Sequence, residues 1–170
     1  LQDLGRLEEA EASYNQAITF KPDFADARYN LGNTLKDLSR LEKAEASYNQ
    51  AIVLKPDYAE AYSNLGITLK ELGRLKDAEA SYNKAIALKP DYVDALYNLG
   101  NTLKELGRLE EAEASYTQSI ALKPEDIKAH NQLLTCLFPQ DKKPAFFTEL
   151  DYLINQDKVN AVIGSLACRS

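Results

Sequence analysis

Residues able to carry out chemistry are few in this chain, and their spacing does not assemble a reactive site. There is a single histidine, His130, and the two cysteines, Cys136 and Cys168, form no CxxC pair. A metal site needs several ligands at short spacings, and a nucleophile needs a base beside it. We therefore predict no enzyme activity, no cofactor and no metal, with His130 packed between helices and both thiols free.

Amide side chains, in contrast, recur at a fixed interval. The main row is evenly spaced and consists of Asn30, Asn64, Asn98 and Gln132. A second, partial row contains Asn33 and Asn101 and is interrupted by Ile67. Because an amide both donates and accepts hydrogen bonds, such rows suit pairing with a peptide main chain of any sequence.

Lysine and tyrosine side chains follow the same interval. The lysine row consists of Lys36, Lys70 and Lys104, beside a row of acidic residues. Such a row is either a solvated face or a set of ligand contacts. Tyr29 and Tyr97 could stack on the side chains of a ligand, or equally pack against the adjacent helices.

The elements that position these residues are set by an internal repeat. Prolines recur at the same constant interval, at Pro22, Pro56, Pro90 and Pro124. Within one repeat, Leu31, Leu35 and Leu38 have the spacing of one helix face, which predicts a first helix, A. A second helix, B, is predicted from Leu41 to Leu54, by the same criterion.

Small residues and turn formers agree with this pairing of helices. Gly32 and Ala44 are expected where helices A and B cross closely. Glycines that tolerate a left-handed backbone are expected at the end of helix A, at Gly5, Gly73 and Gly107, with Ser39 as the exception. Aspartates expected to cap the next helix A are Asp23, Asp57 and Asp91.

The complete pattern resembles the tetratricopeptide repeat, a helical hairpin with a Leu-Gly pair, small alanines, an aromatic residue and a closing proline. The matching residues of one repeat are Leu31, Gly32, Ala44, Tyr48, Ala51 and Pro56. The resemblance extends from residue 1 to about residue 137. Departures from the pattern are Arg28, Tyr62, Leu96 and His130 at the fourth position, usually aromatic, and Ser119 in place of alanine.

The resemblance implies an all-α fold, a right-handed superhelix (α-solenoid) of stacked antiparallel helix pairs whose A helices line a concave groove. The expected array at 1–126 divides into a half repeat and three full repeats, 1–24, 25–58, 59–92 and 93–126. Residues 127–170 are expected to form a degenerate repeat and C-terminal capping helices, or a junction to another domain. These helices are marked by Phe147, Leu150, Leu153 and Ile154, and by Val159, Val162, Ile163 and Leu166.

The function that the resemblance implies is a non-catalytic protein–protein interaction scaffold that binds an extended peptide in this groove. The asparagine row is similar to the asparagine ladder of the superhelical repeats attached to the O-linked N-acetylglucosamine transferase. The predicted peptide-binding residues are Asn30, Asn33, Asn64, Asn98, Asn101, Gln132, Tyr29, Tyr97, Lys36, Lys70 and Lys104. The alternative for the main row is bonding to neighbouring repeats or water.

Chaperone-binding members of the family hold two carboxylates in a clamp, which this chain lacks. Asn33 and Asn64 fit the clamp, but Tyr29, Asp94 and Asn98 occupy its cationic places. We therefore do not expect a co-chaperone.

The formal net charge of −6 disfavours nucleic acid and anionic membranes as partners. No apolar run is long enough to span a bilayer, so a soluble, cytoplasmic protein is expected. Alternative functions are self-association through exposed terminal helices, and a spacer or substrate-recruiting arm of a larger enzyme.

Overall fold

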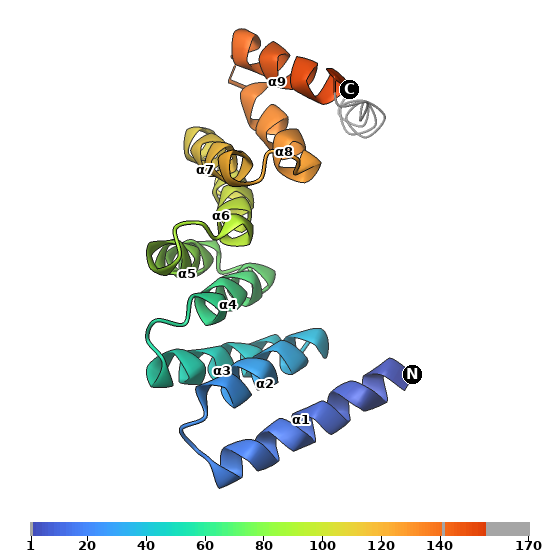
Figure 1. Ribbon diagram of the computed structural model, residues 1–170, viewed down its shortest axis with the longest axis vertical. Helices are drawn as coiled ribbons and strands as arrows, with labels where there is room; N and C mark the ends of the chain where they lie inside the picture. The colour runs from blue at the N-terminus through green and yellow to red at the C-terminus, as the bar shows by residue number, and fades with distance from the viewer. Residues whose placement is uncertain (1, 141, 156–170) are drawn as a thin grey trace. The chain divides into compact units, whose positions relative to one another are not determined.

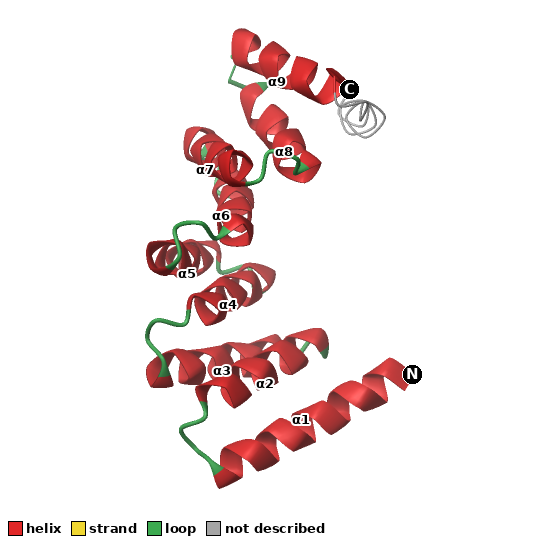
Figure 2. Ribbon diagram, in the orientation of Figure 1, coloured by secondary structure: helices red, strands yellow, loops and turns green. Residues whose placement is uncertain are grey.

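The computed structural model describes residues 2–140 and 142–155. This part of the chain holds nine helices and no strand, as the all-α prediction requires (Figure 2). The predicted final helix at Val159–Leu166 and the second cysteine, Cys168, lie outside the described residues. The chain divides into two compact bodies, Leu1–Ala95 and Leu96–Ser170, which are described separately below as the N-terminal and C-terminal bodies.

Five helices make up most of the N-terminal body. They are α1 (Gln2–Phe20), α2 (Ala25–Asp37), α3 (Leu41–Leu54), α4 (Ala59–Glu71) and α5 (Leu75–Leu88). Helix α2 pairs with α3 and α4 with α5, and each pair is an antiparallel hairpin (Figure 1). In the terms of the repeat, α2 and α4 are A helices, and α1, α3 and α5 are B helices. Each A helix also packs against the B helix that precedes it.

The remaining helices follow the same alternation. They are α6 (Val93–Glu105), most of which belongs to the C-terminal body, α7 (Leu109–Leu122), α8 (Ile127–Leu137) and α9 (Lys143–Asn155). Helix α8 packs against both α7 and α9. The order therefore remains A, B, A, B to the end of the described residues.

Within each repeat, a buried tyrosine of helix B lies on a glycine of helix A. A β-carbon placed on Gly32 would lie 2.6 Å from Cε1 of Tyr48, and one on Gly100 the same distance from Cε1 of Tyr116. Tyr48 and Tyr116 are fully buried. The close crossing predicted from Gly32 is confirmed, and the ring of a tyrosine fills the space that the missing side chain leaves.

The turn after helix A has the left-handed backbone that the sequence predicts, with one error. Gly73 and Gly107 have φ of 75° and 76°, and Ser39 adopts a φ of 58° although it carries a side chain. The prediction for Gly5 is wrong, because Gly5 lies inside the continuous helix α1.

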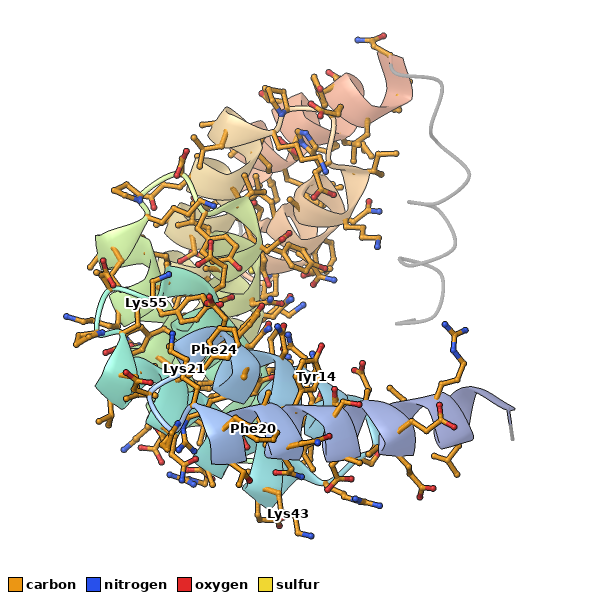
Figure 3. All side chains as sticks on the ribbon, turned by 60° about the horizontal axis from the view of Figure 1, so that its bottom comes forward. Tyr14, Phe20, Lys21, Phe24, Lys43 and Lys55 are labelled. Carbon is orange, nitrogen blue, oxygen red and sulfur yellow. The ribbon has the colours of Figure 1, made fainter. Side chains whose placement is uncertain are left out.

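The predicted aspartate caps are wrong at Asp23 and Asp57. Helices α2 and α4 instead begin after Phe24 and Tyr58, and no side chain caps either helix. The two aromatic residues differ in burial, because Tyr58 is 9% exposed and packs inward whereas Phe24 is 38% exposed. The lysine three residues earlier lies over each ring, and Figure 3 labels Lys21, Phe24 and Lys55 on the two loops.

Helix α9 occupies the place of helix B in one more repeat. It begins at Lys143 and α7 begins at Leu109, so the two starts are one repeat length apart. Leu134 stands at the glycine position and Leu150 at the tyrosine position, and both belong to one apolar cluster with Leu153. Two leucines thus replace the glycine–tyrosine contact, which explains why the hairpin persists where the sequence pattern weakens.

Candidate functional site

Amide side chains of two adjacent A helices meet in the N-terminal body. The Nδ2 group of Asn64, on α4, donates to Oδ1 of Asn33, on α2, at 2.8 Å. It also donates to the hydroxyl of Tyr29 at 3.0 Å. The hydroxyl of Tyr48, on α3, donates to the same Oδ1 of Asn33 at 2.8 Å. Asn33 and Asn64, from the two predicted amide rows, therefore form one network.

These amides are fixed in orientation but not fully covered. Asn33 and Asn64 are both half-buried, whereas Tyr48 is fully buried. Burial raises the pKa of the Tyr48 hydroxyl above its usual range, and this buried hydroxyl donates to Oδ1 of Asn33. The network therefore presents two polar side chains of known orientation at the surface of helices α2 and α4.

Tyr29 packs against neighbouring tyrosines. Its ring centroid lies 4.9 Å from that of Tyr58 and 6.0 Å from that of Tyr48. Tyr97 lies in the same way 6.0 Å from Tyr116 in the C-terminal body. Both rings therefore pack against neighbouring tyrosines, and stacking on a ligand stays a prediction.

The C-terminal body repeats part of this arrangement. The hydroxyl of Tyr116 donates to Oδ1 of Asn101 at 2.8 Å, as Tyr48 does to Asn33. Burial raises the pKa of Tyr116 as well. The ammonium of Lys104 donates to Oε1 of Gln132 and, at 3.3 Å, to the hydroxyl of Thr135. Gln132, the fourth residue of the main amide row, is therefore oriented by Lys104, which is itself a predicted site residue.

The remaining predicted residues also lie on A helices. Asn30 and Asn98 are half-buried, and their backbone carbonyls accept from the hydroxyls of Thr34 and Thr102, at 3.0 and 2.9 Å. Lys36 and Lys70 are half-buried in the last turns of α2 and α4. Each of these side chains therefore lies on an A helix and is partly exposed.

Sequence reasoning missed the ion pairs that join consecutive repeats. Arg40 pairs with Glu11 at 2.5 Å and Arg74 with Glu45 at 2.8 Å, each 29 residues apart. Lys142, at the equivalent place in the C-terminal body, pairs with Glu113 at 2.6 Å. The signal was present, because a basic residue recurs once per repeat from Arg40 to Lys142.

His130 has a packing role between α8 and α9. One ring nitrogen bonds the carboxylate of Glu149 and the other lies 2.7 Å from the carbonyl oxygen of Pro124. The imidazole also stacks on Tyr152 with ring centroids 4.5 Å apart. Cys136 is a fully buried free thiol whose pKa is raised by burial, a setting that does not favour the reactive thiolate.

Two further observations concern the described part of the chain alone. It contains no group of three or more histidine, cysteine or acidic side chains that could hold a metal ion. None of its helices combines the length and apolar character needed to cross a membrane.

The fold and the repeating contacts define a helical-repeat protein, and family models agree. The model described as "TPR repeat" matches residues 1–39, 32–73 and 68–107, and the model described as "Tetratricopeptide repeat" matches residues 93–126. The chain belongs to the tetratricopeptide repeat family, whose members are protein-interaction scaffolds.

Solved structures of the same fold support this assignment. A crystal structure of MamA has a TM-score of 0.86 and 24% identity, covering 94% of each chain. YrrB, titled a TPR protein with an unusual peptide-binding site, has a TM-score of 0.77 and 22% identity, covering 92% of this chain and 85% of that one. The first TPR domain of Spaghetti (RPAP3), bound to an HSP90 peptide, has a TM-score of 0.68 and 24% identity, covering 69% and 93%. No curated relative matches the chain.

Proposed function

We propose that the chain binds an extended polypeptide segment along the surface of its A helices, through amide side chains that pair with the peptide main chain. The observation that carries this proposal is the oriented pair of Asn33 and Asn64 on adjacent A helices. Both amides are half-buried, and each keeps polar capacity that their mutual bond does not use.

The spacing of the helices suits such a ligand. Packed helices lie roughly 8–10 Å apart, and an extended peptide advances about 3.3 Å per residue. One amide per A helix would therefore serve about every third residue of the ligand. Two proteins of the same fold are titled with a peptide-binding site or a bound peptide, which favours this use of the scaffold.

Charge narrows the class of partner. The chain has 26 acidic and 20 basic residues, so an acidic peptide would meet a chain of like net charge. Hydrogen bonds to the peptide main chain do not depend on the identity of the ligand's side chains. The expected ligand is therefore a neutral or basic polypeptide segment, bound with weak sequence selectivity.

The test is peptide selection followed by matched substitutions. Peptides are selected from a random library on the wild-type chain, and their affinity is measured for the Asn30→Ala/Asn64→Ala/Asn98→Ala variant. Each substitution should weaken binding by about 1 kcal/mol if the amide pairs with the ligand. A matched control replaces three exposed asparagines of the B helices, Asn15, Asn49 and Asn83. Equal affinity of the two variants would refute the proposal.

Self-association is a second candidate, favoured by one observation. Ala10 and Tyr14 of α1 are half-buried, whereas the equivalent Ala44 and Tyr48 of α3 are fully buried under α2. Figure 3 labels Tyr14 on this helix. None of the described helices covers the face as α2 covers α3. A molar mass that rises with concentration in light scattering, and falls back in Tyr14→Glu, would support this function, and a constant monomer mass would eliminate it.

A further inference from the structure

The hydrogen bonds of Asn33 and Asn64 use up one end of each amide. Oδ1 of Asn33 accepts from both Tyr48 and Asn64, which fills its two lone pairs. Nδ2 of Asn64 donates to both Asn33 and Tyr29, which uses its two hydrogens. What remains for a ligand is the NH2 group of Asn33, a pure donor, and the Oδ1 atom of Asn64, a pure acceptor.

Tyr48 is the residue that favours this orientation over the inverted one. An isolated pair of asparagines could rotate both amides together and keep a hydrogen bond between them. The Tyr48 hydroxyl opposes this inversion. In the inverted pair it would accept from Nδ2 of Asn33, and its own hydrogen, in a fully buried residue, would lose the acceptor that it has in Oδ1 of Asn33. Its ring cannot shift, since it is fully buried and lies on Gly32.

From these contacts we infer that Tyr48 is a positioning residue that sets the hydrogen-bonding polarity of the Asn33–Asn64 pair, with Tyr29 supporting it. The ligand must offer an acceptor to Asn33 and a donor to Asn64. A single residue of an extended peptide presents its C=O and N–H on the same side, as in a hydrogen-bonded strand pair. This inference rests on the proposed peptide binding and names the atoms that perform it.

Tyr116 acts in the same way on Asn101 in the C-terminal body. Its hydroxyl donates to Oδ1 of Asn101, so the NH2 group is again the end left for a ligand. The neighbouring amide differs, because Oε1 of Gln132 accepts from Lys104. Asn101 and Gln132 therefore both have their oxygen atoms engaged and their NH2 groups left as donors, which favours carbonyl oxygens of the ligand.

The test is a cycle that combines a protein variant with a change in the peptide backbone. The probe is a peptide selected from a random library on the wild-type chain, together with analogues in which each backbone amide in turn becomes an ester. An ester lacks the N–H donor and faces Oδ1 of Asn64 with another acceptor. At one position of the peptide, the ester should weaken binding to the wild type about tenfold.

In Tyr48→Phe the two amides are free to invert together, so that Nδ2 of Asn64 can donate to the ester oxygen. The penalty for the ester should then shrink to about threefold or less, and the unmodified peptide should bind about fivefold more weakly. Tyr14→Phe removes a hydroxyl at the equivalent place in α1, where no asparagine of a described helix A receives it, and should change neither value. If the ester weakens binding by the same factor in the wild type and in Tyr48→Phe, the inference is overturned. Equal factors would mean that Tyr48→Phe weakens the unmodified peptide and its ester analogue alike, as a loss of structure without a change in amide orientation would do.

A measurement without ligand separates this inference from the proposed function. In the free protein, the side-chain amide NMR signals of Asn33 and Asn64 should shift in Tyr48→Phe and stay in place in Tyr14→Phe. Tyr116→Phe should move the signal of Asn101 in the same way. Signals that do not move would refute the positioning role even if peptides bind. Failure to select any peptide, with the signals moving, would refute the proposed function alone.

Discussion

The ring of Tyr48 lies on Gly32 so closely that a β-carbon on this glycine would sit 2.6 Å from the ring. The contact joins helices α2 and α3 and holds the tyrosine hydroxyl 2.8 Å from Asn33. One glycine in the A helix therefore both closes the hairpin and places the donor that orients the candidate site.

Substitution of this glycine should destabilise the chain even though alanine favours helix. Gly32→Ala forces a clash with a fully buried ring, and overpacking of this kind costs about 1–3 kcal/mol. The gain in helix propensity is at most about 1 kcal/mol, so a net loss is expected. Gly5→Ala is the matched control, since nothing lies within 4 Å of its added β-carbon and it should stabilise α1. The measurement is the midpoint of chemical unfolding of each variant. A midpoint for Gly32→Ala that equals or exceeds that of Gly5→Ala would disprove the packing argument.

Alkaline pH should destabilise the folded chain through its buried tyrosines. Burial raises the pKa of Tyr48 and Tyr116 in the folded state, so the folded chain holds these protons more tightly than the unfolded chain. The resulting stability is complete below the ordinary tyrosine pKa of about 10 and is lost as pH rises through the raised value. Each tyrosine should then contribute a loss of about 1.4 kcal/mol per pH unit. Unfolding measured against pH should be less alkali-sensitive in Tyr48→Phe, and an unchanged slope would contradict this origin.

Leu134 and Leu150, in the hairpin of α8 and α9, should tolerate an exchange of side-chain volume between the two positions. Leu134→Gly alone opens a cavity in a fully buried position, at a cost of about 2–5 kcal/mol. Leu150→Tyr alone overfills the same cluster. Together they restore the contact that Gly32 and Tyr48 make, so the double variant should be at least about 1 kcal/mol more stable than the sum of the single effects predicts. Strictly additive losses in chemical unfolding would show that the two positions are not partners.

Removing the imidazole of His130 should loosen α9 from α8. His130→Ala leaves Glu149, which is largely buried, without its partner and removes the stacking on Tyr152. Leaving a buried polar group without its hydrogen-bond partner costs about 1–3 kcal/mol. Hydrogen exchange should accelerate in α9 and remain slow in α3. Acceleration spread equally over both helices, or none, would argue against a local role for His130.

The helical repeat was predictable because its signals recur and each repeat confirms the next. Leucine spacing, glycine position and the closing proline all keep one interval, and the helices begin and end close to where these residues indicate. The errors concerned residue types that are common in more than one structural role, such as an aspartate at a predicted helix start. Asp23 has the residue type of a cap, but helix α2 begins one residue later, after Phe24, and has no side-chain cap.

Contacts between repeats were harder to predict from the sequence. The asparagine rows identified Asn33 and Asn64, but only the structure shows that they bond to each other and to Tyr48. Tyr48 was identified from the sequence as the aromatic residue of the repeat pattern, and its spacing does not indicate where its hydroxyl points. The ion pair of Arg74 with Glu45 was missed for the same reason, since each partner belongs to a different helix.

The amide-mediated binding of a peptide main chain is tested most directly by NMR titration of the wild-type chain with a peptide selected from a random library. Binding should shift the side-chain amide signals of the A-helix asparagines, which are Asn30, Asn33, Asn64, Asn98 and Asn101. The exposed asparagines of the B helices, which are Asn15, Asn49 and Asn83, should keep their signals. Shifts confined to the B-helix asparagines, with the A-helix signals unmoved at saturation, would contradict the account.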